Sequence, residues 1–404
     1  MRTSIINAFG RSNRGDSVLL DECIDEIQTR HPGSQIGVLL FDQYKSDALP
    51  PEVVCLERIG NSQANSRLLR ALSKFLNLGI SMLYAATKIR LLLRLLPDSQ
   101  ARSLRFLQNS DLAVSAPGGY IHDTNLAYIV ALANIFIATR LCKRTLLAPQ
   151  SIGPLKSWLA RRLTRATLNM CDVVCARESY TLQFLDEIGI KQKIIAKCGD
   201  SAFWNDHVCH ESLESSLEEL GLRNQRYIGL TVVNWTFPNR DSPEKLSVEY
   251  VQKVARLIKH LHEISDMKVV IFNQVSDDIC MSDRIAESLD NVDYLVIDRI
   301  EREPWQLRAL IGKSEIFIGT RFHSCIFAIM ASVPTLAISY LPKTQYILDD
   351  LQLPNRSTPI DSIDIDFLCQ QATHLYQNRD SESALMCHAV TSYRSSFSRL
   401  TDFL

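Results

Sequence analysis

The sequence predicts an α/β protein in which two Rossmann-like domains face each other across a cleft. At 404 residues and 46% hydrophobic content, the chain exceeds one ordinary domain and can bury two cores. Short apolar runs alternate with amphipathic stretches along its length, which is typical of parallel strands joined by helices. A polar, charge-rich stretch at residues 206–226 separates two such series. We therefore expect one sheet on each side of this stretch.

The first series of strands defines a predicted N-terminal domain, residues 1–205. Each strand is a short run of apolar residues with turn-forming or polar neighbours, as expected for strands buried on both faces. The clearest runs are Ser4 to Ala8, Ile36 to Phe41, Leu112 to Ala116, Thr145 to Ala148, Val173 to Ala176 and Ile194 to Cys198.

The second series defines a predicted C-terminal domain, residues 227–404, which follows the linker at 206–226 and ends in helices. No internal repeat or low-complexity tract favours another architecture. The strands are Tyr227 to Val233, Lys268 to Phe272, Tyr294 to Ile297, Ile316 to Gly319 and Thr335 to Ser339.

Composition disfavours several classes of protein. A formal net charge of -1 and a pI near 6.8 give no electrostatic case for nucleic-acid binding. The 11 cysteines form no CxxC pair, so we expect a reduced chain without a metal site. The N-terminus reads as a first strand and not as a signal peptide, which favours a cytoplasmic protein.

One strand-to-helix junction of the second domain carries two strong polar side chains. The run Glu315 to Gly319 is short and apolar, and the residues after Arg321 and His323 fit a buried helix. In open α/β sheets, ligands bind at the carboxyl ends of strands, where free helix N–H groups favour anions. Two interpretations stand at this point. The pair forms a ligand site, or the arginine pairs with a buried carboxylate and the histidine caps the helix.

Five further stretches follow predicted strands of the first domain. Paired glycines let a backbone approach a ligand closely, and the side chain of Gln150 offers an amide. The alternatives are structural: Asp16 as the N-cap of a helix beginning at Ser17, Arg177 as a surface arginine, and His122 as a loop histidine. The stretches are "NRGDS" (13–17), "APGGYIHD" (116–123), "APQSIGP" (148–154), "CARES" (175–179) and "CGDSAF" (198–203).

In this order, and followed by "TRFHSCIFAIMASVPTLAISYLPK" at residues 320–343, these stretches resemble the polysaccharide pyruvyl transferase family. The resemblance implies a GT-B-like fold with an acceptor side in the N-terminal domain and a donor side in the C-terminal domain. It also implies transfer of pyruvate from phosphoenolpyruvate onto a sugar of a cell-surface polysaccharide or its lipid-linked precursor, with formation of a ketal. Phosphoenolpyruvate is then a substrate, and neither a cofactor nor a metal is implied.

The resemblance also implies residue roles. Guanidinium groups suit an anionic donor because they grip a carboxylate or phosphate through two hydrogen bonds, and an imidazole carries a proton near neutral pH. The catalytic residues would be Arg321 and His323, and the donor-binding residues Arg177, Arg321 and Lys343. The acceptor-binding residues would be Asp16, Gly118, Gly119, His122 and Gln150.

Two rival functions fit the same predicted fold. A GT-B nucleotide-sugar glycosyltransferase would place a carboxylate soon after His323, and the sequence has none before Asp349. A noncatalytic partner in envelope-polymer assembly would have a decayed site, against which the intact Arg321, His323 and Lys343 argue. The family's three-glycine stretch reads Pro117-Gly118-Gly119 here, which leaves the identity of the acceptor open.

Two basic, apolar stretches suggest contact with an anionic membrane. Phe75 to Leu96 is interrupted by Lys88, Arg90 and Arg94, so it falls short of the roughly 20 apolar residues of a bilayer span. Together with "LKSWLARRLTRATL" at residues 155–168, it fits docking at a membrane surface. Helices that face the core and have solvated basic edges fit it equally well.

Overall fold

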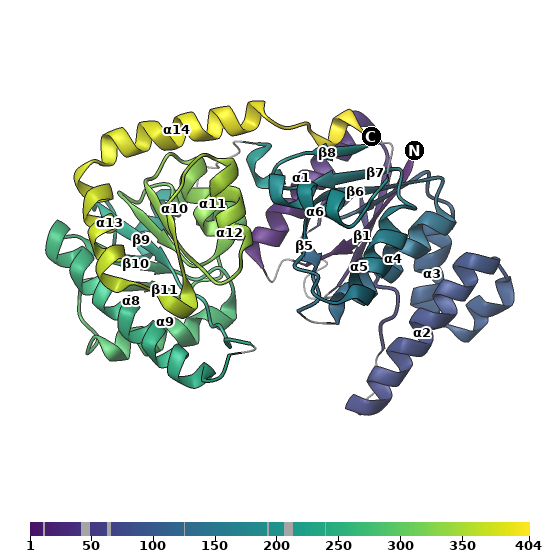
Figure 1. The fold of residues 1–404 in the computed structure, drawn as a ribbon, viewed down its shortest axis with the longest axis horizontal. Coiled ribbons are helices and arrows are strands. Elements are labelled where there is room, and N and C mark those ends of the chain that lie inside the picture. The colour runs from purple at the N-terminus through teal and green to yellow at the C-terminus, as the bar shows by residue number, and fades with distance from the viewer. Residues whose placement is uncertain are drawn as a thin grey trace. The chain divides into compact units, whose positions relative to one another are not determined.

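The computed structural model describes residues 1–10, 13–41, 49–62, 66–124, 126–191, 194–205, 213–238 and 240–404, apart from the side chain of Arg67. The chain forms two compact α/β units (Figure 1). Unit 1 comprises residues 1–12, 16–204 and 397–404, and unit 2 comprises residues 13–15 and 205–396.

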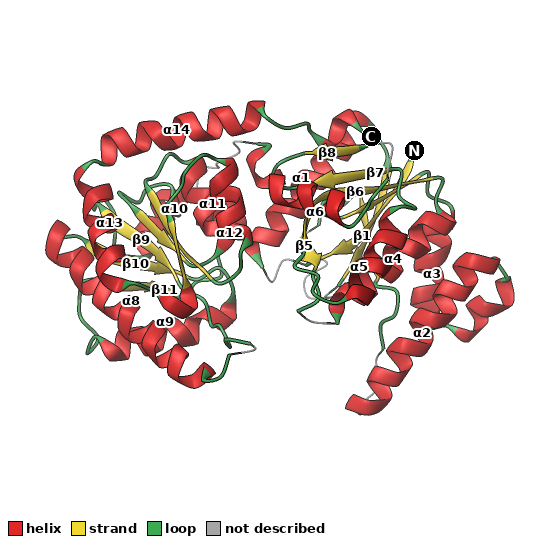
Figure 2. Cartoon of the chain, viewed as in Figure 1, coloured by secondary structure: helices red, strands yellow, loops and turns green. Residues whose placement is uncertain are grey.

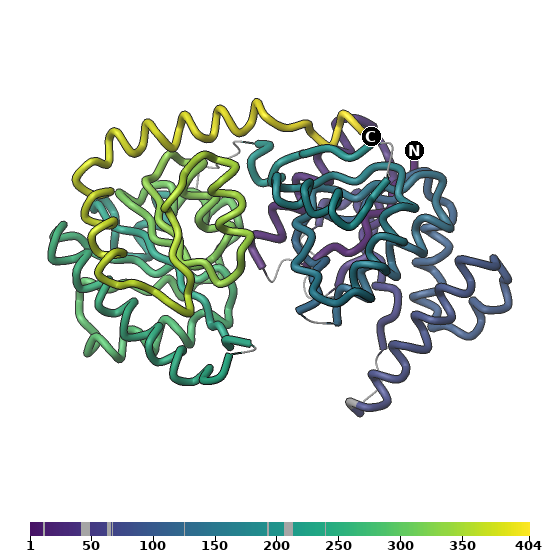
Figure 3. The backbone as a smooth tube through the Cα atoms, in the orientation of Figure 1, coloured from purple at the N-terminus to yellow at the C-terminus, as the bar shows by residue number. Residues whose placement is uncertain are grey.

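This division differs in detail from the predicted domains. Residues 397–404 return to unit 1, so both chain ends lie in that unit (Figure 3). The predicted linker contains a helix, α7 (Leu213–Glu219), which packs against α10 (Pro304–Ile311) of unit 2. Leu213 and Leu217 are buried there, so a charge-rich segment still supplies an apolar face.

The sheet of unit 1 is parallel and lies between helices (Figure 2). Its strand order is β3-β2-β1-β4-β6-β7-β8, with β5 beside β6. Side chains alternate across a strand, so Ile5 and Ile6 of β1 enter two separate apolar clusters on the two faces of the sheet. The strands are β1 (Arg2–Ala8), β2 (Gln35–Leu40), β3 (Val53–Glu57), β4 (Leu112–Ser115), β5 (Gly118–Ile121), β6 (Arg144–Ile152), β7 (Val173–Ala176) and β8 (Ile195–Lys197).

The helices of unit 1 cover both of these clusters. One cluster includes Leu20 and Ile24 of α1, and the other includes Tyr84 of α2 and Ile135 of α4. The helical elements are α1 (Arg14–Arg30), α2 (Arg67–Thr87), η2 (Arg90–Leu95), α3 (Asp98–Gln108), α4 (Ala127–Leu141), α5 (Trp158–Leu168), α6 (Ser179–Glu187), η3 (Ser201–Phe203) and η6 (Leu400–Asp402).

The sheet of unit 2 is also parallel, with the order β11-β10-β9-β12-β13-β14. Counted within the unit, this is the 3-2-1-4-5-6 order of a Rossmann sheet, and the order reverses between β9 and β12. The predicted pair of parallel α/β sheets is therefore confirmed. The strands are β9 (Tyr227–Thr231), β10 (Lys268–Phe272), β11 (Leu295–Asp298), β12 (Phe317–Gly319), β13 (Thr335–Ser339) and β14 (Ser357–Pro359).

The helices of unit 2 flank this sheet. The long helix α8 buries an apolar stripe that includes Tyr250, Leu257 and Leu261. Among the described residues of both units, no helix combines the length and hydropathy that a bilayer span requires. Besides α7 and α10, the helical elements are α8 (Pro243–Ser265), η4 (Ser276–Asp278), α9 (Ile279–Ser288), α11 (Phe322–Met330), α12 (Lys343–Asp350), η5 (Ile360–Ser362), α13 (Ile365–Gln377) and α14 (Arg379–Ser395).

Candidate functional site

The junction between β12 and α11 lies at the point where the strand order of unit 2 reverses. Gly319 ends β12 and pairs with Thr231, the last residue of β9. Arg321 is the N-cap residue of α11, and its backbone N–H donates to Thr231 Oγ1 at 3.4 Å. His323 lies in the first turn of α11. The structure therefore places both residues at the carboxyl edge of the sheet, where such folds bind ligands.

Arg321 forms a two-pronged ion pair with Asp278. Its Nε donates to Asp278 Oδ2 at 2.8 Å, and its Nη2 donates to Oδ1 at 2.5 Å. Asp278 is fully buried, whereas the Arg321 side chain is 15% exposed. The backbone N–H of Asn234 also donates to Asp278, at 3.2 Å. The buried carboxylate that could pair structurally with Arg321 is thus present, and it fixes the plane of the guanidinium group.

The pKa of Arg321 reflects this environment. Burial alone would lower the pKa, but the hydrogen bonds and charge of Asp278, together with Tyr340, outweigh burial and raise it. Arg321 is therefore a permanent cation. A guanidinium group has about five N–H donors. The pair with Asp278 leaves further donors for an anionic ligand.

His323 packs directly against the start of α1. A Cβ atom at Gly15 would lie 2.0 Å from His323 Nδ1, so only glycine fits at this position. The imidazole is 4% exposed, and its ring lies edge-on to Phe322 with 5.0 Å between ring centroids. His323 is therefore a closely packed residue.

The start of α1 is linked to α11 through hydrogen bonds within unit 2. Asn13 Oδ1 accepts from the backbone N–H of Gly15 at 3.0 Å and from Gln274 Nε2 at 2.9 Å. Ser324, which follows His323, donates from its hydroxyl to Gln274 Oε1 at 2.7 Å. These hydrogen bonds connect residues 13–15 to Ser324, the residue that follows the predicted catalytic His323.

Asp16 is not the N-cap residue of a helix beginning at Ser17. The helix α1 begins at Arg14, so Asp16 lies in its first turn. The side chain of Asn13, two residues before Gly15, takes the capping position instead. Asp16 is half-buried and belongs to unit 1.

Lys343 contacts Phe322, the residue between Arg321 and His323 in the chain. Lys343 is the first residue of α12, and its Nζ lies 4.9 Å from the centroid of the Phe322 ring. The same ring contacts His323. The buried ring of Phe322 thus contacts both Lys343 and His323, and Arg321 precedes it in the chain, at the ends of β12 and β13.

Arg177 lies in unit 1, where it is buried at 1% exposure and is not a surface arginine. Its Nε donates to Ser151 Oγ at 2.8 Å, and its Nη1 donates to Asp200 Oδ2 at 3.2 Å. Glu178 Oε2 lies 3.5 Å from Nε. Burial raises the pKa of Glu178, although the charge of Arg177 and hydrogen bonds from Thr181 and Ser151 oppose the shift.

The other residues predicted from unit 1 divide into two groups. Gly119 and Gln150 accompany Arg177: a Cβ at Gly119 would lie 3.2 Å from Arg177 Nη2, and the Arg177 backbone N–H donates to Gln150 O at 3.0 Å. Gly118 precedes Gly119 in β5. Gln150 Nε2 donates to the carbonyl of Ala116.

His122 lies apart from this group in its contacts, half-buried just after β5. Its Nδ1 is 2.6 Å from Thr124 Oγ1, and the neighbouring Asp123 Oδ2 accepts from the backbone N–H groups of Lys156 and Ser157. The local contacts therefore resemble those of a loop histidine.

Sequence reasoning missed Asp278, Tyr340 and Gln274. Asp278 follows β10 and Tyr340 follows β13, so both stand after strands that had been predicted. A search for polar side chains after every predicted strand would have found them. Trp235, after β9, contacts Tyr340 with the two rings tilted and 4.9 Å between their centroids.

Comparison with known proteins decides the family. A family model described as Polysaccharide pyruvyl transferase matches residues 13–342. The chain belongs to this family. The amylovoran biosynthesis protein AmsJ of Erwinia amylovora is 19% identical over 374 residues, which cover 90% of this chain and 89% of that protein. The family predicted from the motifs is therefore confirmed, and with it a role of this pyruvyl transferase in polysaccharide biosynthesis.

Solved structures confirm the GT-B-like fold of the pyruvyl transferase. A glycosyltransferase from Rickettsia africae has a TM-score of 0.59 at 15% identity, with 99% of this chain and 95% of that one covered. A putative UDP-N-acetylglucosamine 2-epimerase from Listeria monocytogenes has a TM-score of 0.61 at 14% identity, with 96% and 90% covered. Within the described part of this chain, no three His, Cys, Asp or Glu side chains gather as metal ligands would.

Proposed function

We propose that this pyruvyl transferase moves pyruvate from phosphoenolpyruvate onto a sugar of a cell-surface polysaccharide or its lipid-linked precursor, as a cyclic ketal. The observation that carries the proposal is the position of Arg321 and His323 at the start of α11, with Lys343 Nζ 4.9 Å from the ring of the intervening Phe322. A donor with a carboxylate and a phosphate needs fixed cations and one group that transfers a proton. This part of unit 2 offers both.

The proposed reaction begins at the methylene carbon of phosphoenolpyruvate. His323 gives a proton to this carbon, which becomes a methyl group, and the neighbouring carbon becomes an oxocarbenium-like centre. A sugar hydroxyl attacks that centre and gives its proton back to His323. Phosphate then leaves with the bonding electrons and recreates the centre, and a second hydroxyl closes the ketal and gives its proton to the departed phosphate. Arg321 and Lys343 hold the donor's negative charges throughout.

Unit 1 supplies the proposed acceptor residues. Gln150 is fully buried, and within the described part of the chain its side-chain oxygen accepts no hydrogen bond. Such an oxygen is costly unless a donor reaches it, and a sugar hydroxyl is such a donor. We assign Asp16, Gly118, Gly119 and His122 to the acceptor side as well. Arg177 is assigned to donor charge, beyond its pairing with Asp200.

The experiment separates this function from nucleotide-sugar transfer. The purified protein is mixed with phosphoenolpyruvate and candidate acceptors, and phosphate release is followed. Parallel mixtures contain nucleotide sugars, and nucleotide release is followed. We expect phosphate release that depends on one class of acceptor. Nucleotide release with no response to phosphoenolpyruvate would instead identify a glycosyltransferase, and no release in either mixture would point to a noncatalytic partner.

A further inference from the structure

The N-terminal half of α2 has large apolar side chains that the rest of unit 1 does not cover. The C-terminal half of the helix is anchored, because Leu78, Tyr84 and Ala85 enter the core cluster. The N-terminal half extends away from the sheet of unit 1 (Figure 1), and Leu68 and Phe75 are 81% and 67% exposed. The exposed large apolar residues of α2 are Leu68, Leu69, Leu72, Phe75, Leu76 and Leu83.

Helical spacing places these six residues on one side of α2, with Arg70 and Lys74 on the other. The helix η2 packs against α2 and adds exposed Ile89, Leu91 and Leu95. The exposed cations Lys88, Arg90 and Arg94 lie in the chain among the apolar residues of this part. We call these nine apolar residues, together with Lys88, Arg90 and Arg94, the α2–η2 surface.

The charge of this segment has one sign. Residues 66–97 contain Arg67, Arg70, Lys74, Lys88, Arg90 and Arg94, and neither aspartate nor glutamate. An uncovered apolar face in a segment whose charged residues are all cations matches a surface that is apolar within and anionic at its edge. We infer that the α2–η2 surface docks unit 1 onto an anionic lipid bilayer, with Leu68, Leu72 and Phe75 entering the headgroup region.

A second copy of the chain fits this surface less well. A two-fold dimer would bring the same patch together from both subunits. Two patches of net positive charge would then face each other, and the segment has no carboxylates to balance Lys88, Arg90 and Arg94 of either copy. Anionic lipid headgroups supply the missing charge.

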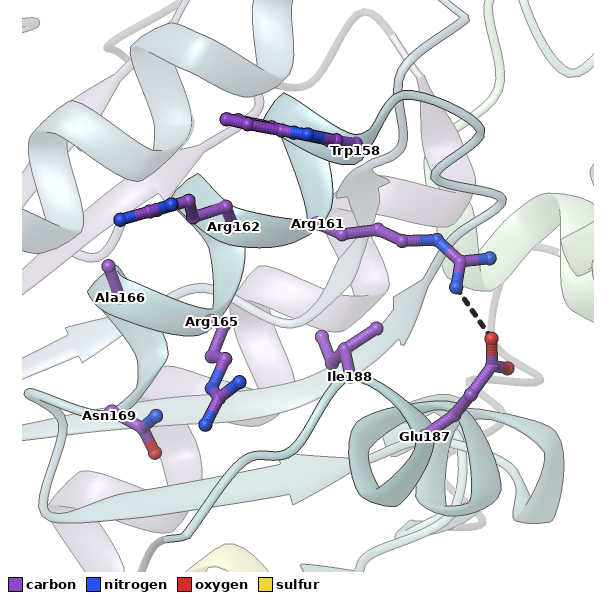
Figure 4. A pocket seen from close by; sticks show the side chains of 8 residues that line it. All are labelled: Trp158, Arg161, Arg162, Arg165, Ala166, Asn169, Glu187 and Ile188. Atoms are coloured by element: carbon purple, nitrogen blue, oxygen red, sulfur yellow. Dashed lines mark hydrogen bonds and ion pairs between the residues drawn. The ribbon is translucent and has the colours of Figure 1, made fainter.

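A neighbouring helix has a similar mixture of side chains. Both α2 and α5 pack against α4, and all three contribute to one core cluster. Trp158 on α5 is 65% exposed, with the Arg162 guanidinium 5.7 Å from its ring centroid. Figure 4 shows Arg161 turned toward Glu187, with which it pairs at 2.6 Å. Trp158 and Arg162 thus form a second exposed pair of an apolar ring and a cation on unit 1.

The inference depends on the surface of unit 1 and not on the chemistry of unit 2. Docking would bring the enzyme to lipid-linked sugars, and this consequence alone rests on the proposed function. The test therefore measures lipid binding and uses no activity assay.

The test is sedimentation of the full chain with vesicles. One set contains phosphatidylcholine alone, and the other contains phosphatidylcholine and phosphatidylglycerol. We expect binding to the second set at low salt and release as salt rises, because the Debye length falls from about 8 Å at physiological ionic strength to about 3 Å at 1 M. Equal binding to both sets, or no binding at low salt, would overturn the inference.

Two variants with matched controls locate the surface. In the first, Leu68, Leu72 and Phe75 are each changed to Ser, and its control changes the exposed Val248, Phe367 and Leu385 of unit 2 to Ser. In the second, Lys88, Arg90 and Arg94 are each changed to Gln, and its control changes the exposed Lys245, Lys259 and Lys313 to Gln.

We expect vesicle binding to fall in both α2–η2 variants and to persist in both controls. A cation near an anionic surface contributes about fivefold in affinity, so the Gln variant should bind about a hundredfold more weakly. Thermal midpoints should stay unchanged, because the altered side chains are exposed. Retained binding by both variants would refute the assignment. A dimer in light scattering that the Ser variant loses, without vesicle binding by the wild type, would identify a second copy as the occupant.

Discussion

Arg321 and Asp278 are joined by two hydrogen bonds, 2.8 Å from Nε to Oδ2 and 2.5 Å from Nη2 to Oδ1. The carboxylate is fully buried, and the guanidinium group is partly exposed. The pair therefore fixes the orientation of the cation, which stays partly exposed. We regard Asp278 as a positioning residue that acts through Arg321.

Asp278→Asn should both destabilise the protein and weaken donor binding. The substitution leaves the Arg321 guanidinium without its buried counter-charge, which costs about 3 kcal/mol of unfolding free energy. The KM for phosphoenolpyruvate should rise more than kcat falls, since a misplaced cation grips the donor poorly. Urea unfolding and steady-state kinetics measure the two effects.

Asp366→Asn is the matched control for this substitution. Asp366 pairs with Arg256, and both side chains are largely exposed. Exposed pairs contribute about 0 to 1 kcal/mol, so the control should change little. Equal, small effects of the two substitutions would show that the buried pair has no special role.

Gly15→Ala should impair catalysis with little change in the secondary structure. The new methyl group would lie 2.0 Å from His323 Nδ1, so the imidazole must move. A displacement of about 1 Å at a reacting group costs roughly a hundredfold in rate. The acceptor-dependent release of phosphate gives the rate, and circular dichroism monitors the fold.

Gly79→Ala provides the comparison, because a Cβ at Gly79 meets nothing within 4 Å. This residue lies within α2, where alanine in place of glycine adds about 0.5–1 kcal/mol of stability. Activity on a water-soluble acceptor should remain at the wild-type level. If Gly15→Ala is equally harmless, the contact with His323 has no catalytic importance.

The strands whose predicted bounds agree best with the structure are central ones. Val173–Ala176, Lys268–Phe272 and Thr335–Ser339 agree with the predicted ranges to the residue, because strands buried on both faces are continuous apolar runs. Three strands were missed. β3 and β14 are edge strands, β14 includes a proline, and β5 begins with two glycines that read as a loop.

The position of the candidate site could be predicted from the sequence, but most of its side-chain contacts could not. A strand end beside a helix N-terminus identifies Arg321 and His323, because the topology fixes where that junction lies. The partners Asp278 and Gln274 follow β10, so a search after every predicted strand finds the residues themselves. Only the packing of α11 against this segment shows which side chains they bond. The same limit applies to Gly15, whose contact with His323 spans most of the chain.

The burial of Glu178 predicts an unusual contribution to the pH dependence of stability. Its pKa in the folded protein lies above the ordinary value of 4.5. Such a group binds its proton more tightly when folded, so it stabilises the protein below its unfolded pKa and loses this contribution as pH rises through the folded pKa. The unfolding free energy of the wild type, minus that of Glu178→Gln, should therefore fall with rising pH.

Asp111→Asn should show the opposite slope. The hydrogen bond from Lys143 lowers the pKa of Asp111 below the ordinary value of 3.8, with help from the Arg2 backbone. This carboxylate stabilises the folded state above its unfolded pKa and loses that contribution in acid. Urea unfolding across the pH range gives both differences. Slopes of the same sign would contradict the assigned environments.

Arg321→Lys tests the fork of the guanidinium group separately from its charge. Lysine keeps the positive charge but cannot make two parallel hydrogen bonds to Asp278 and also present an edge to the donor. We expect kcat/KM for phosphoenolpyruvate to fall by about a hundredfold or more. Lys313→Arg, at an exposed site, should leave it unchanged. Near wild-type kinetics of Arg321→Lys would reduce the role of Arg321 to that of a simple counter-charge.

The transfer reaction in D2O, with the product examined by mass spectrometry, tests whether His323 is the proton donor. If His323 protonates the methylene carbon of phosphoenolpyruvate, the wild type should form a ketal whose methyl group carries one deuterium. His323→Gln should form this product about a hundredfold to ten-thousandfold more slowly, while His260→Gln keeps the wild-type rate. A ketal without deuterium, or wild-type turnover by His323→Gln, would contradict the account.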